Sequence, residues 1–553
     1  MARGDRGSVS RSGQRRTLEG RYRSHPRERR VRAARRLELQ RIPRAKRARG
    51  PFTATLSTLT MRPRHMRLGQ RLRTMLRFQI ATLGLAFALT ACSEAPPARP
   101  NVLFLSVDDM NDWVGALGYE AAQTPHIDRL SERGTLFTNA HAPAPKCNPS
   151  RTAILSGLRP STTGVYVNSE WWKPNLPDVI VLPRYFKDNG YYAAGGGKIF
   201  HHTPGFNPPD SWDEYFDLVS DLKTDGFLVP YRLPRHISSF DWGPLDKTDM
   251  EMGDGATVRW AEEFLSRDHD RPFFLAVGLF QPHLPFYAPR AWYESVGPDD
   301  APVPLDKPGD LDDVPEAGRE LAASRVADLE LIVEHGDMDD VVRSYTAGIR
   351  HADALVGRVL DALDASAYAR NTIVMFWSDH GYHFGEKHHF AKDTLWERSS
   401  RVPLAIIAPG VSTQGGRCSR PVSLINLYPT LVDLCGLPAR DDLEGVSLRP
   451  LLEDPESEWE RPAVMTFRRN NHAVRSERYR YVRYASGAEE LYDHSTDPEE
   501  WTNLASDPAS AAVISQHAQW LPEVNAPQAA TKGAFIFDPE AYTWQRRVAE
   551  TSQ

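Results

Sequence analysis

Residues 146–157 read KCNPSRTAILSG, and the organisation of the chain can be worked out from this stretch. Cys147 is followed by Pro149 and Arg151, and then by an apolar run with helical spacing that ends at Gly157. The pattern predicts a helix that begins at the cysteine, where unpaired backbone N–H groups favour an anion. A turn that contains a buried free thiol is the other interpretation of so short a motif.

Two further stretches place acidic side chains directly after predicted strands. Residues 101–107 form a nearly unbroken apolar run that ends at Asp108-Asp109, and residues 371–377 lead into Ser378-Asp379-His380. Such runs suit central strands of a sheet covered on both faces, and catalytic groups gather at the carboxyl ends of such strands. An Asp-Asp pair alone is more often a turn, but two such ends predict a site for a divalent cation, with an oxygen-rich shell that favours calcium or magnesium.

The stretch at Cys147 resembles the sulfatase signature C-x-P-S-R-x-x-x-L-x-G, with Ser156 where that family more often has threonine. The resemblance runs from Pro100 to about Leu504. It implies that a formylglycine-generating maturation enzyme oxidises Cys147, and that the hydrated aldehyde is the nucleophile. It also implies one calcium ion, with these ligands: Asp108, Asp109, the modified Cys147, Asp379 and His380.

The same resemblance assigns the remaining catalytic side chains. Arg151, one helical turn beyond residue 147, would hold the oxygen of the nucleophile. Lys198 and His201, in Gly-Lys-Ile-Phe-His, would bind the sulfate and the formylglycine hydroxyl. Lys392 would place a second positive charge beside the sulfate. His283, in Gln-Pro-His-Leu-Pro-Phe, would protonate the departing alcohol.

Other histidines lie close to these motifs in the sequence. His202 adjoins His201 but is given no role. His383, His388 and His389 crowd the segment before Lys392, and they are as well explained by solvent or substrate contacts as by catalysis.

Within the sulfatases, Gly-Lys-Ile-Phe-His, Gln-Pro-His-Leu-Pro-Phe and Ser-Asp-His-Gly look most like the iduronate-2-sulfatase group and bacterial polysaccharide sulfatases. His380 in place of asparagine is part of that likeness. The implied substrate is a sulfated carbohydrate of glycosaminoglycans or algal polymers. Two alternatives stay open: a phosphonate monoester or phosphodiester hydrolase on the same fold, and a non-catalytic sugar-binding lipoprotein.

The chain has 553 residues, which is more than one core usually supports. The resemblance implies an α/β fold of the alkaline-phosphatase-like kind, a large mixed, mostly parallel sheet sandwiched by helices. We assign residues 100–436 to this catalytic domain, 437–530 to a small antiparallel-sheet subdomain, and 531–553 to a tail.

The first hundred residues have a different character. Residues 1–74 are rich in arginine, which indicates a disordered arm or an over-extended translation start, with Met61, Met66 or Met75 as the natural first residue. A nucleic-acid-binding arm is the other interpretation, but aromatic residues are not interleaved with the arginines, so we expect no nucleic acid partner.

Residues 75–92 have the basic, apolar and small-residue regions of a signal peptide. Leu-Thr-Ala-Cys at its end resembles a bacterial lipoprotein box, which implies a lipid on Cys92, a tether over 93–99, and export to the periplasm or cell surface. Two of the four cysteines, Cys418 and Cys435, are then left to form a disulfide or to stay as free thiols.

Overall fold

The central strand of the protein, β1 (Asn101–Val107), is buried along its whole length because both faces of its sheet are covered. Leu103, Leu105 and Val107 point into one core cluster, whereas Val102 and Phe104 point into another. This division follows from the alternation of side chains along a strand. A nearly unbroken apolar run is therefore typical of a strand at this place.

We describe a computed structural model of the chain, in residues 99–217, 227–231, 240–298 and 300–547. The predicted arginine-rich segment, signal peptide, lipid-bearing Cys92 and most of the tether lie outside the described residues. Within the described ranges, no helix has the length and apolar character needed to cross a membrane.

The main sheet has eight strands in the order β13-β2-β12-β9-β1-β7-β4-β5. In chain order they are β1, β2 (Thr135–Phe137), β4 (Tyr192–Gly197), β5 (Glu214–Phe216), β7 (Phe273–Gly278), β9 (Thr372–Ser378), β12 (Leu404–Ile407) and β13 (Gly416–Cys418). The strands on either side of β1 are parallel to it, and β12 runs antiparallel to its neighbours β9 and β2. The predicted fold, a mixed and mostly parallel sheet, is confirmed.

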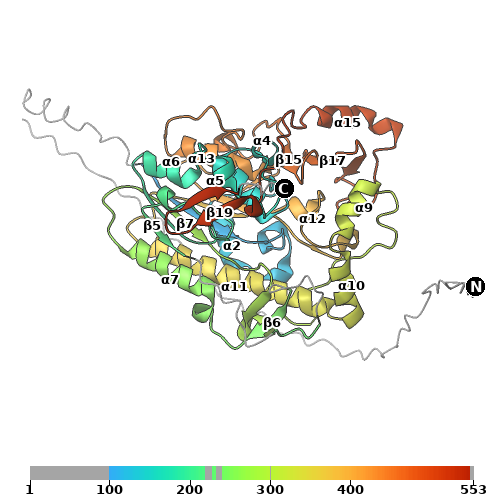
Figure 1. Ribbon diagram of the computed structural model, residues 1–553. Coiled ribbons are helices and arrows are strands. Elements are labelled where there is room, and N and C mark those ends of the chain that lie inside the picture. The colour runs from blue at the N-terminus through green and yellow to red at the C-terminus, as the bar shows by residue number, and fades with distance from the viewer. Residues whose placement is uncertain (1–98, 218–226, 232–239, 299, 548–553) are drawn as a thin grey trace, which may run out of the picture. The chain divides into compact units, whose positions relative to one another are not determined.

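Helices cover both faces of this sheet (Figure 1). One core cluster contains residues of α2 (Pro125–Arg133), α7 (Gly253–Ser266) and α11 (Met338–Ala365). The other contains residues of α3 (Cys147–Ser156), α6 (Leu182–Asp188) and α13 (Leu427–Leu434). The other helices before the second sheet are α4 (Pro160–Thr163), α5 (Trp172–Asn175), α8 (Arg290–Ser295), α9 (Glu316–Ala323), α10 (Val326–His335), α12 (Glu397–Ser400) and α14 (Arg449–Glu453).

A second, antiparallel sheet follows in the sequence, with the order β15-β16-β17-β18. Its strands are β15 (Ala463–Thr466), β16 (His472–Arg475), β17 (Tyr479–Arg483) and β18 (Glu489–Asp493), and α15 (Ala511–Ala518) comes after them. Buried ion pairs tie this sheet to α12: Arg475 and Arg480 both contact Glu397. Arg480 also pairs with Glu500, which follows β18, at 2.8 Å. The contacts with Glu397 join the small sheet to the larger part by charge, and Leu321 and Leu395 pack against its apolar side chains.

The end of the chain is more ordered in structure than the predicted tail implies. Strands β19 (Phe535–Asp538) and β20 (Thr543–Arg546) pair as an antiparallel hairpin. Its aromatic side chains pack against Trp171, so apolar burial holds the hairpin in place. Cys418 and Cys435 are both buried free thiols, with no disulfide between them.

Candidate active site

Helix α3 begins at Cys147 and ends before Gly157, which takes the left-handed conformation that terminates many helices. The predicted helix is confirmed, and the Cys147 side chain is fully buried at its N-terminus. The thiol Sγ lies 3.2 Å from Lys392 Nζ, 3.4 Å from His380 Nε2 and 3.8 Å from Asp109 Oδ1. Residues far apart in the sequence therefore converge on position 147.

The surroundings of Cys147 favour a negative charge. Burial alone would raise the pKa of the thiol, but Lys392, Lys198 and His380 outweigh burial and hold the pKa well below its usual range. A hydrogen bond with His201 acts in the same direction. This site stabilises an anionic atom on residue 147.

Arg151 links the two metal-site strands. Its guanidinium contacts Asp108 Oδ1 at 2.9 Å and Asp379 Oδ2 at 2.8 Å, and it donates to the backbone carbonyls of Lys198 and Ile199. The group is buried, so these are strong charge-assisted interactions. Arg151 thus orients two carboxylates, and its predicted contact with the oxygen of the nucleophile stays a prediction.

The backbone at Asp109 is held in a strained conformation. Its φ is 59°, a left-handed value that costs energy for a residue with a Cβ. The Tyr345 hydroxyl donates to the Asp109 carbonyl at 2.7 Å, and the Asp109 N–H donates to Asp379 Oδ1 at 3.1 Å. Tyr345 gives no sequence signal for this role, because an aromatic residue on the buried face of α11 looks like ordinary core.

The two lysines reach the site from opposite sides. Lys198 follows Gly197, where a Cβ would lie 2.0 Å from the Gly278 carbonyl oxygen, so glycine permits the close approach of β4 and β7. Lys198 Nζ contacts Asp108, and Lys392 Nζ lies 2.5 Å from Asp109 Oδ1. Both ammonium groups therefore lie beside the carboxylates and close to position 147.

The Lys392 segment is fixed to the Cys147 segment by neighbours of both residues. Lys146 Nζ pairs with Asp393 at 2.5 Å, one residue from each catalytic side chain. His389 bonds to the carbonyls of Ala322 and Lys392 through its two ring nitrogens. His383 is also buried and bonds to Thr394, so both histidines support the loop, whereas His388 is exposed.

His201 and His283 lie on the remaining sides. His201 is buried within hydrogen-bonding reach of the thiol, and burial lowers its pKa to about 4, which keeps the ring neutral. His283 Nε2 lies 3.9 Å from Asp108 Oδ2 and 3.8 Å from Asp109 Oδ2. His283 Nδ1 bonds to the Leu284 carbonyl, which aims Nε2 at the carboxylates. All the predicted site residues are thus brought together.

The donor set fits a hard divalent cation. Ligand atoms of Asp108, Asp109, Cys147 and His283 lie within 4.8 Å of one another, as do those of Cys147, Asp379 and His380. The carboxylate oxygens are the ligands that calcium and magnesium prefer. His380 Nδ1 bonds to the Gly381 carbonyl at 3.1 Å, which directs Nε2 towards Asp109 and Cys147.

The pKa values of these candidate ligands are shifted by burial and by neighbouring charges. Burial opposes ionisation of Asp108, but Lys198, His283 and Arg151 hold its pKa well below the usual range. Burial raises the pKa of Asp379 to about 6. For His380, burial is outweighed by Asp379 and Asp109, which raise its pKa to about 9. A cation bound there would compete with that proton.

The C-terminal hairpin lines a cavity beside the site, and the prediction of a plain tail missed this. The cavity has a volume of about 380 Å³, and its walls include His201, His202, Phe537 and Tyr542. Lys532, just before the hairpin, donates to Thr203 Oγ1 at 3.1 Å. Aromatic residues at every second position on either side of Asp538-Pro539 are the sequence signal that could have revealed these strands: Phe535, Phe537, Tyr542 and Trp544.

Comparison with known proteins agrees with this geometry. The family model described as Sulfatase matches residues 100–437, and that described as N-sulphoglucosamine sulphohydrolase, C-terminal, matches residues 385–526. The chain belongs to the sulfatase family. It is 37% identical over 446 residues to a sulfatase of Formosa agariphila, covering 77% of this chain and 87% of that protein. It is 30% identical over 416 residues to mouse (Mus musculus) iduronate 2-sulfatase, covering 66% and 74% respectively.

Solved structures share the fold. A 2-O GAG sulfatase superposes with a TM-score of 0.60 at 23% identity, covering 76% of this chain and 91% of that one. The phosphonate monoester hydrolase of Agrobacterium radiobacter has a TM-score of 0.62 at 23% identity, covering 81% and 100%. At this identity the likeness establishes the alkaline-phosphatase-like fold and no particular substrate.

Proposed function

We propose that this sulfatase hydrolyses O-sulfate esters on sugar units of a sulfated glycan, through a formylglycine made from Cys147 and with one bound calcium ion. The observation that carries the proposal is the convergence on position 147 of Lys392, His380 and Asp109, in surroundings that stabilise an anion. A sulfate ester needs a nucleophile, positive charge around its oxygens and a proton for the leaving alcohol. The site contains a candidate for each.

Relatives support a carbohydrate as the alcohol part of the ester. An ulvan-active sulfatase of Formosa agariphila is 27% identical over 462 residues, and the iduronate 2-sulfatase likeness is 30%. A structural neighbour was solved with its substrate D-glucosamine-2-N,6-O-disulfate. Choline-sulfatase and arylsulfatases are also among the relatives, so the relatives alone do not identify the alcohol part of the ester. The sugar is therefore part of our proposal.

Asp108, Asp109, Asp379 and His380 would hold the calcium ion, with residue 147 completing its surroundings. Bound there, the ion would neutralise charge on the sulfate oxygens. Lys198 and Lys392 would share this task, because their ammonium groups lie beside the same carboxylates and can turn to donate to an anion.

Formylglycine at position 147 would supply a hydroxyl nucleophile from its hydrated aldehyde. Helix α3 orients that group and the strained turn at Asp109 faces it, so attack on sulfur needs little rearrangement. His283 would donate a proton from Nε2 to the leaving oxygen. His201, which is neutral and buried, would accept a proton from residue 147 as sulfate departs.

The first prediction tests the reaction class. With a formylglycine-generating enzyme co-expressed, kcat/KM should be higher for p-nitrophenyl sulfate than for p-nitrophenyl phosphate or a phenylphosphonate monoester, and sulfated oligosaccharides should release sulfate. Cys147→Ala should lower kcat by on the order of 10⁴-fold, because the nucleophile is lost. Cys418→Ala removes a buried thiol outside the site and should leave kcat unchanged. A preference for the phosphonate ester would establish the alternative reaction.

The second prediction concerns the metal. Asp108→Asn and Asp379→Asn should lower the calcium content of purified protein and remove the rise in Tm that calcium gives, which corresponds to about 2.7 kcal/mol at 100 times Kd. Asp353→Asn is the control, because this buried carboxylate on α11 bonds only to backbone N–H groups of His126 and Ile127. Unchanged calcium content in both site variants would refute the ligand assignment.

The third prediction separates the two histidines by leaving group. His283→Ala should lower kcat by about 10²–10⁴-fold on a sugar sulfate, because an alkoxide needs a proton. On p-nitrophenyl sulfate the loss should be small, because the phenolate leaves unprotonated. His201→Ala should slow both substrates alike, and exposed His388→Ala should affect neither. Equal losses on both substrates for His283→Ala would show that it is not the acid.

A further inference from the structure

Two adjoining cavities lie beside the small sheet, and the larger is lined in part by the turn between β16 and β17 and by α15. The larger has a volume of about 270 Å³ and the smaller about 50 Å³. Both are lined by the same five residues: Pro421, Trp459, Arg461, Pro462 and Trp520. We call the combined cavity the Trp459–Trp520 groove.

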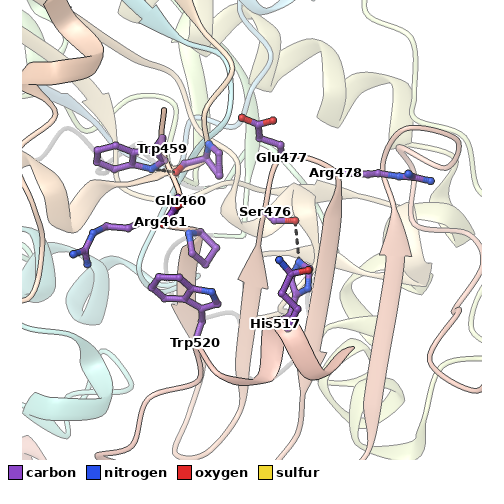
Figure 2. Close-up of a pocket in the computed structure, with 11 residues that line it drawn as sticks. Trp459, Glu460, Arg461, Ser476, Glu477, Arg478, His517 and Trp520 are labelled. Carbon is purple, nitrogen blue, oxygen red and sulfur yellow. Dashed lines mark hydrogen bonds between the residues drawn. The ribbon is translucent and has the colours of Figure 1, made fainter. Parts of the chain in front are cut away.

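The groove has an aromatic wall. Figure 2 shows the Trp459 and Trp520 indoles on the same side of the larger cavity, with Arg461 between them in this view. Trp459 Nε1 donates to the Pro421 carbonyl at 3.0 Å, which fixes the orientation of that ring. Trp520 follows α15 and is 38% exposed, one of few large apolar side chains so open to solvent. Fixed indoles offer flat apolar area at a small entropic cost, which suits the apolar face of a sugar ring.

Two arginines, Arg159 and Arg461, line the smaller cavity of the groove. Arg159 Nη1, in the smaller cavity, is buried and has no hydrogen-bond partner among the described residues. Burial lowers the pKa of Arg159, Glu444 opposes this, and Arg461 lowers it further, so the two guanidinium groups lie close enough to repel. A buried N–H group without an acceptor is costly, so Arg159 Nη1 is suited to donate to a ligand.

The acidic side chains nearby are mostly committed elsewhere. Glu444 accepts from the Arg159 backbone N–H and from Thr162 Oγ1. Glu477 pairs with Arg420, and Glu460 is exposed at the rim. The Glu444 carboxylate attracts Arg159, so the groups left for an anionic ligand are the unsatisfied Nη1 of Arg159 and the exposed guanidinium of Arg461.

The groove is separate from the catalytic centre. Helix α3 has ten residues between Cys147 at its start and Ser156 at its end, and Arg159 lies beyond that end. Ten residues of α-helix span about 15 Å, so a group bound at Arg159 cannot be the sulfate that reacts at position 147.

We propose that the Trp459–Trp520 groove is a second, non-catalytic site that binds a sulfated sugar unit of a glycan chain, with the sugar face on the indoles and the sulfate on Arg159 and Arg461. The proposal rests on the function proposed above, since it assigns the ligand as another part of a sulfated glycan. Engagement of a long chain at two points would raise its affinity without altering the chemistry at residue 147.

Binding and hydrolysis are measured separately to test this. Arg461→Gln and Trp520→Ala are compared in an inactive Cys147→Ala chain, by titration calorimetry with a heparin hexasaccharide and with its fully desulfated counterpart. We expect a second binding event for the sulfated hexasaccharide, weakened about tenfold or more by either substitution. Arg483→Gln, an exposed arginine of the same sheet outside the groove, should leave it unchanged. Unaltered Tm in each variant shows that the sheet is intact.

Other results would overturn the groove site. The proposal is overturned if all variants bind the sulfated hexasaccharide with the same affinity. It is also overturned if the desulfated hexasaccharide binds as tightly as the sulfated one. Inorganic sulfate bound as tightly as the saccharide, with no effect of Trp520→Ala, would show an anion site that does not recognise sugar. In chains with Cys147 present, p-nitrophenyl sulfate turnover should be unaffected by both groove substitutions. If the unsubstituted chain does not hydrolyse p-nitrophenyl sulfate at all, the proposed function is refuted. The binding measurements then still decide whether the groove binds a sulfated saccharide.

Discussion

The site depends on the contacts that the Arg151 guanidinium makes. The guanidinium joins Asp108 after β1, Asp379 after β9 and the carbonyl of Lys198 after β4, so one side chain sets the relative positions of three strand ends. All three charged groups are buried. Burial of ions is expensive unless each is paired, and loss of one partner from such a set costs about 3–5 kcal/mol. The catalytic groups are therefore held in place by charge, on a sheet that apolar packing makes rigid.

This arrangement places carboxylates that could bind a cation next to surroundings that favour an anion on residue 147. The carboxylates collect on one side of position 147, and Lys392, Lys198 and His380 lower the pKa of Cys147 in spite of burial. The strained turn at Asp109 persists because Tyr345 and Asp379 both bond to its backbone. Strain of this kind pre-orients a ligand atom before substrate binds.

Local patterns predicted particular strands and the start of one helix, whereas the fold class and the roles of the site residues came from the resemblance to the sulfatases. The apolar run before Asp108 gave a central strand, and Cys147 followed by helical spacing gave the start of α3, because short-range periodicity determines both. The support of the site could not be predicted. Tyr345 looks like core, and the Lys146–Asp393 and His389–Lys392 contacts join residues whose proximity follows only from tertiary packing. The β19–β20 hairpin lies within the segment predicted as a tail, although aromatic residues at every second position mark its strands.

The central claim is that the working nucleophile is a formylglycine derived from Cys147. The most direct test is the mass of the peptide that contains residue 147, measured in preparations made with and without the maturation enzyme. Conversion of the thiol to the aldehyde lightens the peptide by about 18 Da, since sulfur and two hydrogens are replaced by one oxygen. We predict that the lighter fraction rises in proportion to specific activity. Full activity in a preparation whose peptide carries only the unmodified thiol would contradict the account.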